Sequence, residues 1–123
     1  MNPGKKILIA EDEPDLIKVL QKRVSAAGYD TILAADGRKA LELFDSRKPD
    51  LVLLDVMMPG MDGWELIRYI KDIRRSRSPV LVLTAKTGEK DKMIGVDILK
   101  ADAYMTKPFD PDELIKKIRE LAG

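Results

Sequence analysis

The chain is predicted to be an α/β protein with a five-stranded parallel sheet and helices on both faces of that sheet. Short apolar runs alternate along it with longer segments in which apolar residues recur every three or four positions. The connections between these segments are short, and no repeat or linker separates them. Such regular alternation is typical of strand–helix–strand units, which build parallel sheets. We therefore expect one doubly wound domain over residues 1–123.

The first half of the chain is expected to contain three strands and two helices. Pro14 suits a first helical turn, and Gly28 suits the end of the same helix. The consecutive apolar residues at 51–54 predict a strand that is buried on both faces. The expected strands are 6–10, 29–34 and 51–54, and the expected helices are 14–28 and 36–44. The inward residues of these helices are expected to be Leu16, Val19, Leu20 and Val24, and then Ala40, Leu41 and Phe44.

The second half is expected to contain two more strands and three helices. Asp62 followed by Glu65 resembles a capping box, in which two side chains bind free backbone N–H groups at the start of a helix. The acidic residues at 110–113 cap the last helix. The expected strands are 79–83, ending at Thr84, and 103–106, and the helices follow Asp62, span about 88–99, and follow Asp110. The inward residues of the first and last of these helices are expected to be Leu66, Ile67, Ile70 and Ile73, and then Leu114, Ile115, Ile118 and Leu121.

The composition excludes several classes of function. The chain has 123 residues, of which 45% are hydrophobic and 35% charged, the profile of one ordinary globular domain. Its net charge of +1 gives no reason to expect direct binding of nucleic acid by this domain. It contains no cysteine and no histidine, so thiolate chemistry, disulfides and a histidine base are excluded. Any metal must therefore be a hard cation bound by oxygen atoms.

The sequence also predicts where the protein works. No apolar segment is long enough to span a bilayer. The apolar run at 7–10 is too short for a signal peptide. We therefore expect a cytoplasmic protein with no membrane partner.

Side chains that can take part in chemistry follow four of the predicted strands. Glu11 and Asp12 follow the first strand, Asp55 ends the third, Thr84 ends the fourth and Lys107 follows the fifth. In open α/β sheets the site lies outside the carboxyl ends of the strands, so we expect these side chains to converge there. Two carboxylates about 4 Å apart repel by roughly 4 kcal/mol at an effective dielectric of about 20. A divalent cation would offset this repulsion, and oxygen ligands with open positions for water match Mg²⁺.

A carboxylate, Mg²⁺, a lysine and a hydroxyl group together suit phosphoryl transfer. Negative charge in that transition state spreads over the equatorial oxygens, so catalysis is mostly positioning and stabilisation by cations. Asp55 would be the nucleophile and would form an aspartyl phosphate. It needs no histidine base, because a carboxylate is already ionised at neutral pH.

Four motifs, taken in order, resemble the receiver domain of two-component response regulators, including the chemotaxis regulators. They are Glu11-Asp12, the segment from Asp55 through Met58-Pro59 to Asp62-Gly63, Thr84-Ala85, and Tyr104 followed by Lys107-Pro108-Phe109. The resemblance covers essentially the whole chain. It implies a flavodoxin-like (βα)5 fold with the strand order 2-1-3-4-5.

The resemblance also implies roles for the acidic residues. Asp55 accepts a phosphoryl group from the phosphohistidine of a sensor histidine kinase or a phosphotransfer protein. Asp12 and Asp55 bind Mg²⁺ directly, with the backbone carbonyl of Met57 as a third ligand. Glu11 acts on the metal largely through water.

A switch is implied as well. Lys107 pairs with the phosphoryl oxygens, Thr84 hydrogen-bonds the phosphoryl group, and Tyr104 then turns inward. The surface formed by the fourth helix, the fifth strand and the fifth helix changes shape and meets a downstream effector, which amounts to a shift between two populated forms. The peptide before Pro108 is implied to be cis. Such a domain catalyses its own phosphorylation and slow dephosphorylation and is not a separate turnover enzyme.

Three other kinds of protein share features with this pattern. A flavin- or nucleotide-binding module needs glycine or hydroxyl residues after the first strand to bind phosphate, whereas residues 11–15 are largely acidic. Aspartyl-phosphate hydrolases that use Mg²⁺ resemble Asp-x-Asp at the nucleophile, and here the second acid is replaced by Met57. A receiver-like binding module that is never phosphorylated is the third alternative, and the complete set of site residues argues against it.

The segment 100–104 departs from the pattern of the family. Receivers commonly have Gly-Ala-Asp-Asp-Tyr there, and this chain has Lys100-Ala101-Asp102-Ala103-Tyr104. Ala103 removes one candidate for the acidic and basic pairs in the symmetric dimer of winged-helix regulators. We therefore predict no strong dimer through this surface.

Overall fold

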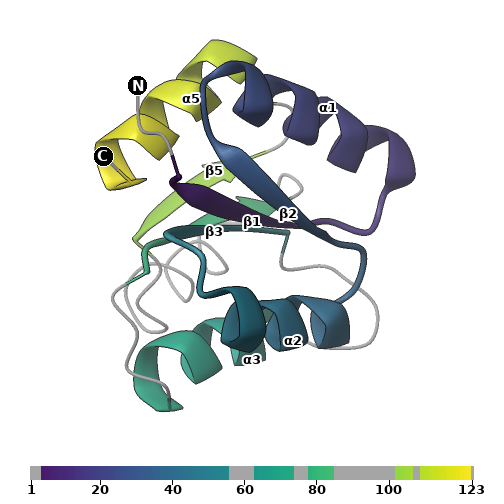
Figure 1. Cartoon of the computed structure of the whole chain (residues 1–123), viewed down its shortest axis with the longest axis vertical. Coiled ribbons are helices and arrows are strands. Elements are labelled where there is room, and N and C mark those ends of the chain that lie inside the picture. The colour runs from purple at the N-terminus through teal and green to yellow at the C-terminus, as the bar shows by residue number, and fades with distance from the viewer. Residues whose placement is uncertain (1–3, 56–62, 74–77, 85–101, 107–108, 123) are drawn as a thin grey trace.

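The computed structural model describes residues 4–55, 63–73, 78–84, 102–106 and 109–122. The five predicted strands are present in these residues and form one sheet (Figure 1). They are β1 (Lys6–Ala10), β2 (Asp30–Ala34), β3 (Leu51–Asp55), β4 (Val80–Thr84) and β5 (Ala103–Thr106). Each neighbouring pair is parallel, and the order is β2-β1-β3-β4-β5. The predicted fold class and strand order are confirmed.

Helices cover both faces of this sheet (Figure 1). One face carries α1 (Pro14–Ala26) and α5 (Pro111–Ala122), and the other carries α2 (Gly37–Arg47) and α3 (Gly63–Arg68). A π-helical turn, η1 (Tyr69–Ile73), continues α3. The helix expected at about 88–99 and the expected cap at Asp62 lie outside the described residues. None of the described helices is long and apolar enough to cross a membrane.

The core consists of two clusters of buried side chains, one on each face of the sheet, because successive residues of a strand point to opposite faces. The α1/α5-side cluster contains Ile7, Ile9, Leu20, Val24, Tyr29, Leu51, Leu53, Leu81, Leu83, Leu114, Ile118 and Ala122. The α2/α3-side cluster contains Leu8, Ala10, Ile32, Ala34, Ala40, Phe44, Val52, Leu54, Leu66, Ile67, Ile70, Val80 and Val82. Strand β3 contributes to both clusters, and all of its residues are buried. Its apolar run therefore reflects burial on two faces, as predicted.

Most helix termini follow the expected local chemistry. Pro14 is in the first turn of α1. Asp36 is the N-cap of α2, and its carboxylate accepts a hydrogen bond of 2.8 Å from the backbone N–H of Lys39. The carboxylate of Asp110 likewise accepts from the N–H of Asp112 at 2.8 Å, just before α5. The end expected for α2 at residue 44 was wrong, because the helix continues to Arg47.

The inward face predicted for α1 needs one correction. Val19 is 48% exposed, so its expected place in the core was wrong. Ile17 packs instead against the α1/α5-side cluster, beside Leu20 and Val24. Successive helical residues are rotated by about 100°, so a stripe through Ile17, Leu20 and Val24 leaves Val19 on the solvent side. The side chain of Ile73, also expected to be inward, lies outside the described residues.

Candidate functional site

Two acidic residues lie next to each other at the carboxyl edge of the sheet. In the pairing of β1 with β3, Ala10 is opposite Leu54. Glu11 directly follows Ala10, and Asp55 directly follows Leu54. The backbone N–H of Glu11 also donates to the carbonyl of Ala34 at 3.0 Å, so Glu11 continues the line of β1. The parallel topology therefore brings these two acids together, as expected from the sequence.

Asp12 completes a cluster of three carboxylates. One carboxylate oxygen from each of Glu11, Asp12 and Asp55 lies within 4.8 Å of the others. Glu11 is 1% exposed and Asp55 is 5% exposed, while Asp12 is open to solvent. Buried like charges at this spacing are unfavourable unless a cation or hydrogen bonds compensate them. The cluster is thus an oxygen-only donor set with one side facing water, which suits a hard divalent cation.

The start of α1 helps to define this cluster. Glu13, and not Asp12, is the N-cap residue, and its side chain makes no capping hydrogen bond. The backbone N–H of Glu13 donates to Oε2 of Glu11 at 3.2 Å, which orients the Glu11 carboxylate. Asp12 is therefore not the N-cap of α1. Asp12 is left as the exposed carboxylate of the cluster.

Thr84 lies on β4, next to β3, and Tyr104 lies on β5, the strand beyond β4. Thr84 ends β4, and its backbone is in register with Thr106 at the end of β5. Its position at the carboxyl edge matches the expectation, and its side chain lies outside the described residues. Tyr104 is opposite Val82, is half-buried, and packs against the α2/α3-side cluster. Met57, Lys107 and Pro108 lie outside the described residues, so their expected roles stay predictions.

Sequence reasoning assigned no role to the opposite, amino edge of the sheet, where two aspartates pair with backbone groups. The N–H of Asp50 donates to the carbonyl of Lys6, and the N–H of Lys6 donates to Oδ2 of Asp50, each at 2.8 Å. Asp102 makes the same two-way contact with Val80, with distances of 3.0 and 2.7 Å. The sequence signal is an aspartate placed one residue before a predicted strand.

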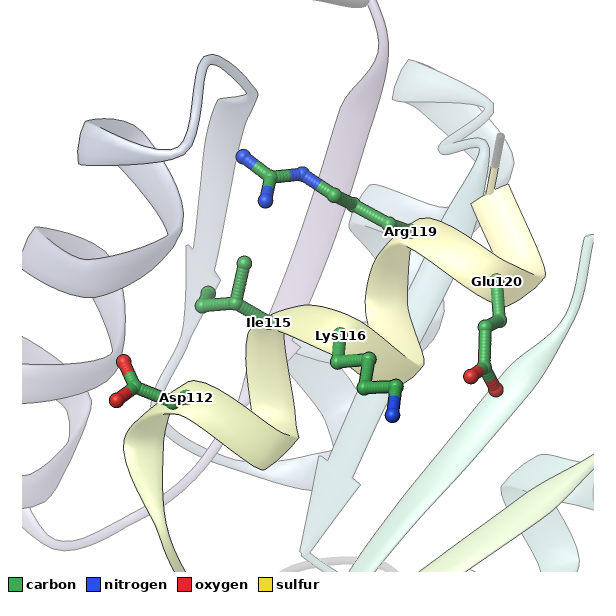
Figure 2. A pocket seen from close by; sticks show the side chains of 5 residues that line it. All are labelled: Asp112, Ile115, Lys116, Arg119 and Glu120. Carbon is green, nitrogen blue, oxygen red and sulfur yellow. The ribbon is translucent and has the colours of Figure 1, made fainter.

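A shallow pocket lies along α5, apart from the acidic cluster (Figure 2). It is lined by Asp112, Ile115, Lys116, Arg119 and Glu120. In Figure 2, Ile115 and Arg119 point toward α1, and a guanidinium nitrogen of Arg119 lies 3.5 Å from the carbonyl oxygen of Ala27. Its lining residues all come from α5, and none of them belongs to the acidic cluster. The pocket therefore does not compete with the carboxyl edge as the functional site.

Comparisons with known proteins agree with this geometry. The model of the response regulator receiver domain matches residues 7–119. The alkaline phosphatase synthesis transcriptional regulatory protein PhoP of Bacillus subtilis is 43% identical over 118 residues, which are 96% of this chain and 48% of that protein. The chain thus spans about half the length of this relative.

Solved structures show the same fold. The receiver domain of the Francisella response regulator 1452 has a TM-score of 0.90 and 33% identity, with 98% of this chain and 97% of that chain covered. The chemotaxis protein CheY4 of Vibrio cholerae has a TM-score of 0.87 and 30% identity, with 95% of this chain and 98% of that chain covered. With the acidic cluster at the carboxyl edge and the 2-1-3-4-5 sheet, these matches establish that the chain belongs to the response regulator receiver domain family.

Proposed function

We propose that residues 1–123 are a single receiver domain that accepts a phosphoryl group on Asp55 within a two-component or phosphorelay system. The observation that carries this proposal is the burial of Asp55 at the end of β3, beside Glu11 and Asp12. Three carboxylates this close repel one another unless a cation or hydrogen bonds compensate them, and a purely structural role does not require such a cluster. It is an arrangement expected of a metal-assisted nucleophile.

The cation proposed for this cluster is Mg²⁺. The donor set fits it, because three carboxylate oxygens lie within 4.8 Å of one another and one of the three residues is open to solvent. Asp12 and Asp55 would be direct ligands, the backbone carbonyl of Met57 a third, and Glu11 would act largely through water. When bound, the ion would neutralise negative charge on the oxygens of the transferring group.

Three residues of the chain would take part directly in the phosphoryl transfer. A carboxylate oxygen of Asp55 attacks phosphorus, and the phosphorus–nitrogen bond to the donor histidine breaks. The electron pair stays on the imidazole nitrogen, which takes a proton from solvent. Lys107 would pair with the phosphoryl oxygens, and Thr84 would donate a hydrogen bond to one of them. The donor is a sensor histidine kinase or a phosphotransfer protein.

Phosphorylation would act as a signal and not as one step of substrate turnover. Tyr104 would move inward, and the surface of β5, α5 and the helix expected at 88–99 would present a different shape to a downstream effector. Slow hydrolysis of the aspartyl phosphate would reset the domain. The proposal includes a cytoplasmic location and no direct contact of this domain with nucleic acid or membrane.

One experiment separates this proposal from the alternative of a receiver-like binding module. The protein is incubated with acetyl phosphate, with and without Mg²⁺, and its intact mass is measured for the wild type and Asp55→Asn. We expect one phosphoryl adduct that needs Mg²⁺ and is lost in the variant. The absence of an adduct on folded wild-type protein under all conditions would contradict the proposal and favour the binding module.

A further inference from the structure

The start of β5 is held by Asp102. Its backbone N–H donates to the carbonyl oxygen of Val80 at 3.0 Å, and its Oδ2 accepts from the N–H of Val80 at 2.7 Å. Within the described sheet, β5 is an edge strand and is hydrogen-bonded only to β4. The register of β5 is therefore fixed from one side, and the contact between Asp102 and Val80 defines where the pairing begins.

A lysine from another layer of the protein binds the same carboxylate. Nζ of Lys71, in the π-helical turn η1, lies 2.7 Å from Oδ2 of Asp102. It also donates to the carbonyl oxygen of Ser78 at 2.9 Å. The side chain of Lys71 is 13% exposed and that of Asp102 is 35% exposed, so water screens this ion pair only in part. One ammonium group thus joins η1, the residues before β4 and the residue before β5.

The ion pair and Tyr104 lie on the same face of the sheet. Lys71 follows Ile70 in η1, and Ile70 belongs to the α2/α3-side cluster, so the ion pair reaches Asp102 from that face. Tyr104 packs against the α2/α3-side cluster, to which α3 and η1 contribute buried residues. Ala103 and Met105 pack against the α1/α5-side cluster instead. A slip of one residue in β5 would therefore move Tyr104 to the wrong face.

Asp50 makes the same backbone contact as Asp102 but without an ion pair to a lysine among the described residues. Asp50 holds the start of β3 to Lys6 by the same two-way backbone contact. In the described part of the chain, no ion pair to Asp50 accompanies it, and β3 has neighbours on both sides. The aspartate alone suffices at a central strand. The ion pair with Lys71 occurs at the edge strand that contains Tyr104.

We propose that Lys71 is a positioning residue for Tyr104. Through its ion pair with Asp102 it holds β5 in the register that keeps the Tyr104 ring on the α2/α3 side. Loss of the ion pair loosens the start of β5 and changes the distribution of ring positions before any phosphoryl group is present. This inference rests on the proposed function in one respect only, which is that Tyr104 is the residue that moves.

The test follows Tyr104 by fluorine NMR in the full chain labelled with 3-fluorotyrosine. The chain has three tyrosines, so three signals are assigned by single replacement with phenylalanine. Tyr29 is buried in the α1/α5-side cluster and serves as the internal reference. We expect the Tyr104 signal to shift or split in Lys71→Met and to return in Lys71→Arg.

Two further variants make the result specific. Asp102→Asn removes the charge but keeps an oxygen that can accept from the N–H of Val80, so it should move the Tyr104 signal in the same direction as Lys71→Met. Lys117→Met is the matched control, because it removes a 3.3 Å ion pair to Glu120 whose side chains are 41% and 51% exposed. It should leave the Tyr104 signal in place.

A Tyr104 signal that stays unchanged in folded Lys71→Met or Asp102→Asn would overturn the inference, even if the melting temperature falls. The measurement uses no phosphodonor and is therefore independent of chemistry at Asp55. If the wild type is phosphorylated but the Tyr104 signal does not move in these variants, the positioning role is refuted and the proposed function is not. A shifted Tyr104 signal in a protein that cannot be phosphorylated supports the positioning role and refutes the proposed function.

Discussion

The hydroxyl group of Tyr69 donates a hydrogen bond of 2.9 Å to Oδ2 of Asp45, and this contact joins η1 to α2. The ring of Tyr69 is half-buried and packs against the α2/α3-side cluster. Replacement by phenylalanine keeps the ring and removes only the hydroxyl group. Tyr69→Phe should therefore lower the free energy of unfolding by about 1.5–3 kcal/mol, the usual net value of a hydrogen bond to a charged group. Urea denaturation measures this, and an unchanged midpoint would show that the contact contributes nothing.

Neutralising Asp55 should stabilise the metal-free protein. Asp55→Asn removes one of three clustered carboxylates, and we expect the free energy of unfolding to rise by about 1–2 kcal/mol in EDTA. Asp30→Asn changes an exposed carboxylate outside the cluster and is the matched control. Thermal denaturation in EDTA checks both variants. Equal effects of the two substitutions would show that the cluster is not under electrostatic repulsion.

Magnesium should stabilise the wild type far more than the Asp12→Asn variant. A ligand that binds only the folded state at 100 times its dissociation constant adds about 2.7 kcal/mol to the free energy of unfolding. We expect the melting temperature of the wild type to rise with Mg²⁺ concentration and that of Asp12→Asn to rise far less. A similar rise in both proteins would place the ion elsewhere.

Replacement of Lys48 by glycine should stabilise the protein. It is the C-cap of α2 and has a φ of 47°, a left-handed conformation that glycine adopts without steric strain. Lys48→Gly should raise the free energy of unfolding by about 0.5–1 kcal/mol. Glu42→Gly, at an exposed position within α2, should lower it by about 1 kcal/mol. Destabilisation by both substitutions would contradict this account of the C-cap.

Two neighbouring residues of α1 should respond very differently to truncation. Leu20 is 1% exposed in the core, and Leu20→Ala should lower the free energy of unfolding by about 2–5 kcal/mol. Val19 is 48% exposed, and Val19→Ala should change it by less than about 0.5 kcal/mol. Chemical denaturation of the two variants compares them directly. A large loss in Val19→Ala would contradict the orientation of the helix.

The sequence predicted the elements whose signals are local. The apolar run at 51–54 and the cap at Asp110 each depend on residues close together in the chain. The acidic cluster of Glu11, Asp12 and Asp55 could also be predicted, because parallel strands bring their carboxyl ends to one edge. These features follow from periodicity and topology alone.

The features that escaped prediction depend on packing between distant segments. Val19 and Ile17 are both apolar β-branched residues in α1, and the position of the sheet decides which one packs against the core. The π-helical turn after Arg68 has no signal in the apolar spacing. The ion pair of Lys71 with Asp102 joins residues 31 positions apart, so neither residue predicts the other.

The complete burial of β3 has a mechanical consequence for a signalling domain. A central strand with neighbours on both sides is expected to exchange its amide hydrogens only when the whole domain unfolds. Asp55 therefore ends a strand that is held on both sides, and added bulk at its carboxylate would not be relieved by displacement of that strand. Any conformational change would then occur in segments with fewer neighbours, such as β5 at the edge of the described sheet. Under the proposed function, the phosphoryl group would be added to a strand that is held on both sides, and the change of shape would occur at the edge of the sheet.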